Sequence, residues 1–349
     1  MISLRQAWPA PAAPRPIVVI GAGAIVRTAH LPAYTRLRFP VAGLYDIRRD
    51  VAVQTARQFG GVPVFNTLAD AVAQDAVFDI AVPGAAIAGV LEHLPHGAAV
   101  LIQKPMGETL DAARRILVIC RERRLNAAMN FQLRFSPNVM ALQSLVAAGR
   151  LGDIVDIDVR VVDRQPWEQW SFLKGAPRLE VLYHSIHYLD TIRWIAGEPA
   201  GLMCRAIAHP ELVEFHDTRS TIVLDYGDRI RCSLVLNHTH GQDSTHRESF
   251  IKVEGTHGAA IATLGVNLDY PCGPPDRLEV SVSGAWQSVA LRGSWFTEAF
   301  EGPMSNLQRV VAGEDAALIS PVDDAIKTMA LVEACYASGA GPSTPIPAV

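Results

Sequence analysis

The chain has 349 residues, of which 49% are hydrophobic and 19% charged, and its formal net charge is −4. This length allows two domains with separate cores, and the composition excludes a mostly disordered chain. No long basic block suggests nucleic acid as a partner, and no apolar stretch is long enough to cross a membrane. The five cysteines are widely spread without a C-x-x-C pair, which argues against a disulfide framework and favours a reducing, cytoplasmic location.

The first 16 residues contain four prolines and only interrupted apolar residues. We expect an extended or mobile lead-in segment there rather than a signal peptide, which needs a continuous apolar core. Ile17–Ile20 follows as a short β-branched run, and such a run predicts a buried strand.

A glycine-rich turn comes directly after this strand. Residues 21–26 match the dinucleotide fingerprint G-x-G-x-x-G except at the third glycine, where Val26 stands. Gly21 would permit the tight turn, and Gly23 would allow a pyrophosphate to approach the backbone. The N–H groups of Ala24 and Ile25 would then open a helix towards that anion.

The next elements extend this unit. The helix is expected to end or kink at Pro32, and residues 41–46 form a second strand with Asp46 at its end. An acid at this distance from the glycines takes the ribose hydroxyls of NAD, whereas Arg48 and Arg49 could accommodate the 2′-phosphate of NADP. We therefore expect NAD, with NADP open; an ordinary βαβ unit without cofactor is the alternative.

Strands and helices then alternate up to about residue 130. We predict strands at 62–65, 78–82, 100–102 and 125–131, and helices at 49–59, 68–74, 86–94 and 110–124. This alternation predicts a doubly wound parallel sheet, a Rossmann dinucleotide-binding domain over residues 17–130. Ligands of such sheets bind at the carboxyl ends of the strands, so we place Pro83, Gln103 and Lys104 with the cofactor. A solvated lysine at a strand end is the alternative for Lys104.

The pattern changes after residue 130. We predict helices at 139–148, 183–195 and 321–337, and strands at 154–162, 202–208, 219–226, 230–237, 248–254, 259–264 and 278–282. This order predicts an α+β domain over residues 131–349 with a large, mostly antiparallel open sheet. The last helix, 321–337, could pack back on the first domain. The open face of the sheet is the expected self-association surface of a homodimer or homotetramer.

Residues 183–194 form the densest polar and aromatic segment of the chain. On a helix, Tyr183 and His187 are four residues apart and share a face, with His184 on a neighbouring face. A histidine and a tyrosine at this spacing are a plausible proton-transfer pair. A core histidine bonded to Asp190 is the alternative.

Together these motifs resemble the Gfo/Idh/MocA family of oxidoreductases. The resemblance covers nearly the whole chain after the lead-in and rests on Gly21-Ala-Gly23 with Asp46, on Gln103-Lys104-Pro105 where the family has Glu-Lys-Pro, and on residues 130–137, 149–154 and 187–194. It implies hydride transfer between a nicotinamide cofactor and a hydroxyl carbon of a small polyhydroxylated substrate, namely a sugar, sugar acid or cyclitol. It also implies that Lys104 bonds the reacting oxygen and that His187 is the general base or acid. The chemistry agrees, because a lysine cation stabilises developing negative charge and histidine titrates near neutral pH.

Two departures from the family pattern leave alternatives open. Gln103 stands in place of the glutamate and adds no negative charge beside the lysine. Tyr183 stands where the family often has an aspartate, so it could bond substrate, act as the acid or base, or mark an altered proton relay. The alternatives to a dehydrogenase are a redox-neutral NAD-dependent lyase or isomerase and a non-catalytic nucleotide-binding sensor.

Five residues are candidates for substrate binding: Gln132, Arg134, Trp167, His184 and His238. The first two belong to the 130–137 motif, and Trp167 lies in an aromatic loop that could stack on a sugar face or simply anchor the loop. His238 and His240 alternate on a predicted strand, which favours a substrate-facing or dimer-facing role over a metal site. We expect no metal.

Overall fold

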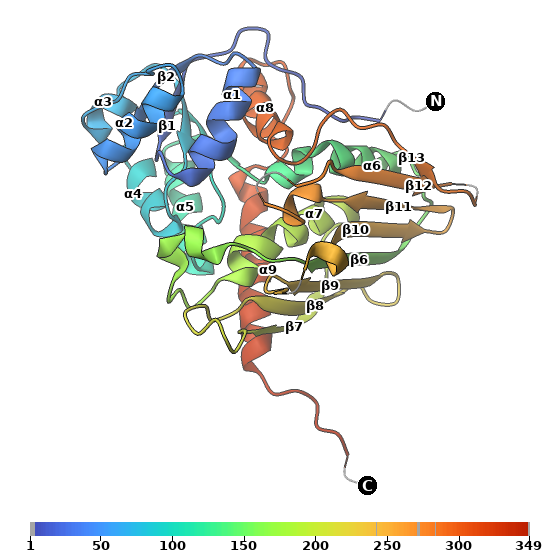
Figure 1. Cartoon of the computed structure of the whole chain (residues 1–349). Coiled ribbons are helices and arrows are strands. Elements are labelled where there is room, and N and C mark those ends of the chain that lie inside the picture. Colours follow the sequence, from blue (N-terminus) through green and yellow to red (C-terminus); the bar gives the residue numbers. More distant parts are fainter. Residues whose placement is uncertain (1–3, 242, 271–272, 283, 348–349) are drawn as a thin grey trace.

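The computed structural model of the chain describes residues 4–241, 243–270, 273–282 and 284–347. Figure 1 shows a parallel sheet built from residues 17–129 beside a larger sheet built from residues 154–288. The predicted fold, a Rossmann domain with a mostly antiparallel second domain, is confirmed. Cys272 lies outside the described residues, and the other four cysteines are free and buried.

The first sheet has five parallel strands in the order β2-β1-β3-β4-β5. Its strands are β1 Ile17–Ile20, β2 Val41–Tyr45, β3 Val77–Ile80, β4 Ala99–Ile102 and β5 Asn126–Met129. Its helices are α1 Leu31–Arg36, α2 Arg49–Gln58, α3 Leu68–Val72, α4 Ile87–Leu91 and α5 Leu110–Glu122. The strand order reverses between β1 and β3, and open α/β sheets bind ligands at such a switch point.

The prediction of a strand at residues 62–65 is wrong. This segment forms a single bridge, between Val64 and Leu44, beside β2. The N–H of Leu44 donates to the carbonyl of Pro63 at 2.9 Å, but Pro63 has no N–H with which to extend a ladder.

The sequence predicted that the helix after the glycine turn ends or kinks at Pro32, and the structure shows that it does not end there. A π-helical turn, Val26–His30, leads directly into α1, which runs to Arg36. Because the helical turns are continuous through this point, the missing N–H of Pro32 leaves one carbonyl of the preceding turn without its helical partner.

The second sheet has eight strands in the order β13-β12-β11-β10-β6-β9-β8-β7, and only β6 and β9 are parallel. Its strands are β6 Ile154–Val162, β7 Gly201–Ile207, β8 Arg219–Asp225, β9 Arg231–Asn237, β10 Glu248–Gly255, β11 Gly258–Thr263, β12 Arg277–Ser281 and β13 Gln287–Ser288. Buried and exposed side chains alternate along β8 and β9, so one face of the sheet faces the core. Helix α6 (Pro137–Ala147) packs on that sheet at β11 and β12.

The chain returns to the first sheet after residue 300. Helix α8 (Glu301–Val311), which was not predicted, packs against β4 and β5 beside α1 (Figure 1). Its first turn contains Gly302 and Pro303, which are typical of a loop and hide the helix from a sequence pattern. Helix α9 (Val322–Ala340) packs against α5 of the first domain, and against β7 and helix α7 (Ile186–Ala196) of the second. The C-terminal helices therefore join the two sheets.

The described part of the lead-in, residues 4–16, is extended and is bonded to the end of α8. The indole N–H of Trp8 donates to Asp315 at 2.7 Å, and its ring packs edge-on to Phe135 with centroids 5.6 Å apart. The N–H of Arg15 donates to Gln308 at 2.8 Å. The segment thus continues directly into β1 along the outside of the molecule.

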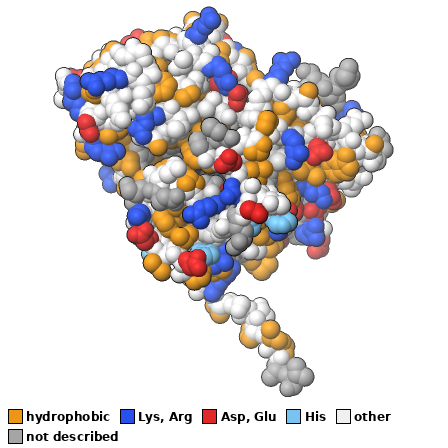
Figure 2. All heavy atoms as spheres, viewed as in Figure 1, with side chains coloured by type: hydrophobic (Ala, Val, Ile, Leu, Met, Phe, Trp, Pro, Cys, Tyr) orange, Lys and Arg blue, Asp and Glu red, His pale blue; other side chains and the backbone are white. Residues whose placement is uncertain are grey.

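Figure 2 shows one face of the molecule, on which basic and acidic side chains are interspersed and separate small hydrophobic patches. None of the described helices combines the length and the hydropathy needed to cross a membrane.

Candidate active site

The glycine turn after β1 has a backbone conformation that requires glycine at position 21. Gly21 has φ +98°, and a Cβ there would lie 2.3 Å from the carbonyl oxygen of Ala81. A Cβ on Gly23 would meet nothing within 4 Å, so the backbone at Gly23 borders open space. An anionic group can therefore approach the backbone at Gly23, whereas Gly21 serves the turn itself.

Asp46 is tied to this turn by two backbone hydrogen bonds. Its Oδ2 accepts from the N–H of Ala22, and its Oδ1 accepts from the N–H of Arg48, both at 2.8 Å. Each carboxylate oxygen keeps a further lone pair with which to accept a hydrogen bond. The half-buried acid is thereby held at the end of β2, next to the start of the helix that Ala24 and Ile25 open.

The residues at this edge of the sheet fit a dinucleotide. The open backbone at Gly23 and the helix start at Ala24 suit a pyrophosphate, and the fixed carboxylate of Asp46 suits ribose hydroxyls. Pro83 is exposed in the turn that follows β3. Arg48, two residues after Asp46, is also exposed.

Lys104 connects this edge to the second domain. It follows the buried Gln103, whose side-chain oxygen accepts the N–H of Lys104 at 3.2 Å. The ammonium of Lys104 donates to the backbone carbonyl of Tyr183 at 2.6 Å, and the Lys104–Pro105 peptide bond is cis. Burial lowers the pKa of Lys104 to about 8.

His187 lies in the first turn of α7, in the same neighbourhood. Its ring is buried and packs edge-on to Trp295 with centroids 5.5 Å apart. Burial and then the charge of Lys104 hold the pKa of His187 well below its usual range, so the imidazole is neutral. Its Nδ1 has no hydrogen-bond partner among the described residues. The alternative that His187 bonds Asp190 is wrong, because Asp190 bonds Arg134 instead.

Tyr183 lies in a π-helical turn, Val181–Ser185, that runs into α7. The ammonium of Lys104 lies 6.0 Å from the centroid of its half-buried ring. Burial, and then the charge of Glu108, raise the pKa of Tyr183 to about 12. Its hydroxyl is therefore protonated at neutral pH and able to donate a hydrogen bond.

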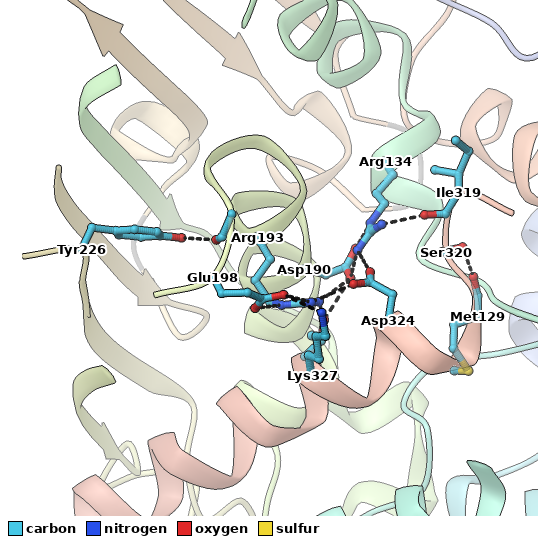
Figure 3. Close-up of polar contacts among 12 residues, drawn as sticks. Met129, Arg134, Asp190, Arg193, Glu198, Tyr226, Ile319, Ser320, Asp324 and Lys327 are labelled. Carbon is cyan, nitrogen blue, oxygen red and sulfur yellow. Dashed lines mark hydrogen bonds and ion pairs between the residues drawn. The ribbon is translucent and has the colours of Figure 1, made fainter. Parts of the chain in front are cut away.

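The prediction that Arg134 binds substrate is wrong. Its guanidinium is buried and donates to both carboxylate oxygens of Asp190 and to Asp324, each at 2.7 Å (Figure 3). The remaining nitrogen donates to the carbonyl of Ile319 at 2.7 Å. Arg193 also binds Asp324, at 2.9 Å, so this ion network joins α7 to α9. Four of the five N–H groups of Arg134 are thus used within the protein, and they hold the histidine helix in place.

Two further substrate candidates are buried. Trp167 is 2% exposed and packs in a small cluster with Leu173, Leu179 and Phe215, as the loop-anchor alternative predicts. His238 has no exposed surface. Neither ring has a free surface for a sugar, so the prediction of direct substrate contact is wrong for both.

The other two substrate candidates remain predictions. Gln132 is 3% exposed, and its side-chain oxygen has no partner among the residues that the structure describes. His184 is half-buried, and its ring lies 4.9 Å from that of Trp167. Burial, and then the charges of His238, Lys104 and His187, hold its pKa well below the usual range.

Sequence reasoning missed Asp163, which flanks His238 opposite Glu180. Both acids have a signal in the sequence that indicates a buried partner. Asp163 continues the alternation of buried residues along β6, and Glu180 interrupts the apolar run from Leu179 to Leu182. An acid at a buried position of an apolar pattern requires a buried partner.

The first domain has the features of a NAD-binding Rossmann domain, and two family models match the chain. Residues 15–131 match the oxidoreductase family with an NAD-binding Rossmann fold, and residues 139–261 match the GFO/IDH/MocA C-terminal domain. The chain belongs to the Gfo/Idh/MocA family, and the predicted resemblance is confirmed. NAD is the cofactor of this family fold.

Curated relatives of the chain are distant. An uncharacterised protein of Sinorhizobium fredii is 26% identical over 196 residues, which are 52% of each chain. D-apiose dehydrogenase of Rhizobium rhizogenes is 23% identical and covers 71% of this chain and 72% of its own length. Inositol 2-dehydrogenase of Rhizobium meliloti is also 23% identical, with 69% and 71% covered. The chain spans about half the length of the first of these relatives.

The solved structures agree with the fold over most of the chain. An oxidoreductase from Agrobacterium radiobacter, in complex with NAD+, L-tartaric acid and magnesium, superposes with a TM-score of 0.79 at 20% identity. It covers 94% of this chain and 97% of its own. Aldose-aldose oxidoreductase from Caulobacter crescentus, complexed with glycerol, gives 0.78 at 14% identity, with 94% and 98% covered.

Proposed function

We propose that this protein is an NAD(P)-dependent dehydrogenase or reductase that acts on a hydroxyl carbon of a sugar, sugar acid or cyclitol. One observation carries the proposal: the half-buried Lys104 and a neutral His187, whose Nδ1 has no hydrogen-bond partner among the described residues, flank the edge of the sheet that has the dinucleotide turn. The relatives named D-apiose dehydrogenase and inositol 2-dehydrogenase support this substrate class.

The two residues have complementary roles. Lys104, as an ammonium, bonds the reacting oxygen and stabilises its developing negative charge. His187 is neutral and accepts the hydroxyl proton through its free Nδ1. Tyr183, with its raised pKa, donates a hydrogen bond to the substrate rather than acting as the base. Bound NAD would accept or supply the hydride.

NAD is the preferred cofactor in this proposal. The fixed carboxylate of Asp46 favours ribose hydroxyls and would repel a 2′-phosphate. Gly21, Gly23, Ala24, Ile25 and Asp46 would hold the dinucleotide, with Pro83, Gln103 and Lys104 towards its nicotinamide end. The exposed Arg48 keeps NADP open.

The test is a screen of sugars, sugar acids and cyclitols with NAD and with NADP, followed by absorbance of the reduced nicotinamide. Lys104→Met should abolish turnover while NADH binding, followed by fluorescence, persists. Lys252→Met, on β10, is the matched control and should keep full activity. Substrate consumption without net NADH would support a redox-neutral lyase or isomerase. Cofactor binding without turnover of any compound would support a nucleotide-binding sensor.

We also propose that the protein forms a homodimer or homotetramer in the cytoplasm. Met203, Ile207 and Val223 are exposed on β7 and β8, and a second copy would cover them. Light scattering that shows a monomer would contradict this part.

A further inference from the structure

A second group of ionisable side chains lies beside the Lys104–His187 pair, fully buried. His238 follows β9 and lies between two carboxylates. Its Nδ1 is 2.7 Å from Asp163, and its Nε2 is 3.3 Å from Glu180. None of the three side chains has exposed surface. Such a group is costly to bury unless the charges compensate one another.

Both carboxylates are fixed by further hydrogen bonds. Gln165 donates to the second oxygen of Asp163 at 2.7 Å, and the hydroxyl of Ser185 donates to Glu180 at 2.7 Å. Burial alone would lower the pKa of His238, but Asp163 and Glu180 raise it to about 10. His238 is therefore an imidazolium at neutral pH; its Nδ1 bonds Asp163, whereas Glu180 lies at ion-pair distance from Nε2 without forming a hydrogen bond.

His184 packs directly on this cation. The two imidazole centroids are 4.4 Å apart with the ring planes tilted by 52°, and the edge of Trp167 supports His184 from another side. His184 is half-buried, unlike His238, and forms no hydrogen bond through its ring to the side chains that the structure describes. Its nitrogens are thus available to a ligand.

Three described charged or titratable groups face His184, each from a different element. They are His238 after β9, Lys104 after β4 and His187 on α7; Asp163 and Glu180 in turn contact His238. Burial opposes a positive charge on His184 most strongly, the charges of His238 and Lys104 add to this effect, and His187 would add to it if it were protonated.

We propose that His184 is a substrate-contacting residue and that His238, wedged between Asp163 and Glu180, is a positioning residue that supports the His184 ring and keeps it neutral. A neutral imidazole donates through one nitrogen and accepts through the other, which matches a hydroxyl of the substrate. An imidazolium could only donate, and it would repel the ammonium of Lys104. The substrate contact rests on the proposed function, whereas the charge relation between the two histidines does not.

The charge relation is tested by a histidine NMR titration of the full chain without substrate. The His184 signal, assigned with His184→Gln, should remain that of a neutral ring well below the ordinary histidine pKa of about 6.5. In His238→Gln its pKa should rise by more than one unit. His93→Gln, at an exposed histidine, is the control and should leave it unchanged.

Two results would overturn the charge relation: an ordinary pKa for His184 in the unmodified chain, or an unmoved one in a folded His238→Gln variant. Should His238→Gln fail to fold, His238→Gln/Asp163→Asn removes one cation and one carboxylate together and should produce the same rise.

The substrate contact is tested by kinetics with NAD and myo-inositol or D-apiose as probes. His184→Asn should raise KM at least tenfold with kcat changed less than threefold, since it removes a contact to a non-reacting hydroxyl. In His238→Gln, kcat/KM should fall below about pH 6.5 because His184 becomes protonated there. The double variant His184→Asn/His238→Gln should not show this fall at low pH. Unchanged KM in His184→Asn overturns the contact. Turnover of no compound in the screen removes the proposed function and the contact with it, while the NMR result still decides the charge relation.

Discussion

The dinucleotide turn and the lysine–histidine site lie at the same edge of the molecule but are built in opposite ways. The turn is made within residues 21–48, and backbone N–H groups fix Asp46. The lysine–histidine site joins Lys104 to Tyr183, 79 positions further along the chain. A local motif suffices for the turn, whereas the second site depends on how the two domains pack together.

Buried ion pairs place the histidine helix. Arg134 and Arg193 clamp Asp190 of α7 and Asp324 of α9 together, next to the strand end at which Ser320 bonds Met129 (Figure 3). Tyr226 and Lys327 extend the contacts around Glu198 and the end of α7. The helix that carries His187 is thus oriented by charges that take no part in the proposed reaction.

Breaking this clamp should have the largest effect. Arg134→Ala leaves the carboxylate of Asp190 buried without its main partner, which should lower the free energy of unfolding by about 3–5 kcal/mol. Urea denaturation followed by circular dichroism measures this loss. Arg121→Ala breaks the exposed pair with Asp323 and should cost less than about 1 kcal/mol. Equal losses in the two variants would contradict a structural role for Arg134.

Alanine substitutions at the two glycines of the turn should have different effects: one on stability and the other on cofactor binding. Gly21→Ala forces a Cβ against Ala81 at a positive φ and should cost roughly 2–3 kcal/mol of stability. Gly23→Ala meets open space and should change stability by less than about 0.5 kcal/mol. The same methyl should weaken NADH binding about tenfold, measured by fluorescence titration. Unweakened binding in Gly23→Ala would mean that no pyrophosphate lies against this turn.

The comparison also explains what the sequence could predict. The strand at Ile154–Val162 was predicted with the bounds that the structure has, because its alternation is local. The partners of Arg134 and His238 are 56 and 75 residues away, so a motif or a strand pattern could suggest polar function but not burial. Both were assigned to substrate for that reason. The prediction for Trp167 is wrong for the same reason, since its burial depends on Phe215, which lies in a distant loop.

The pH dependence of activity should sharpen the role of Lys104. Its pKa, lowered to about 8 by burial, means that the ammonium loses its proton above pH 8 and with it the stabilisation of the oxyanion. The kcat/KM for substrate oxidation should therefore fall above pH about 8, approaching tenfold per pH unit. Lys104→Arg, if active, should remove this limb because arginine stays charged. A profile that is flat to pH 10 would contradict the role.

Of these predictions, Tyr183→Phe should have the smallest effect. It decides whether this tyrosine replaces the family's aspartate as a proton carrier. With a pKa of about 12, the hydroxyl offers only a hydrogen bond, so its loss should lower kcat/KM about two- to fivefold, or roughly 0.5–1 kcal/mol. The limb near pH 8 should remain, because Tyr183 does not titrate there. Tyr226→Phe, which loses a bond to Gly197 away from the site, is the control for a generally weakened fold. A fall of about a hundredfold or more, confined to Tyr183→Phe, would make the tyrosine the acid or base and would reduce His187 to a supporting ring.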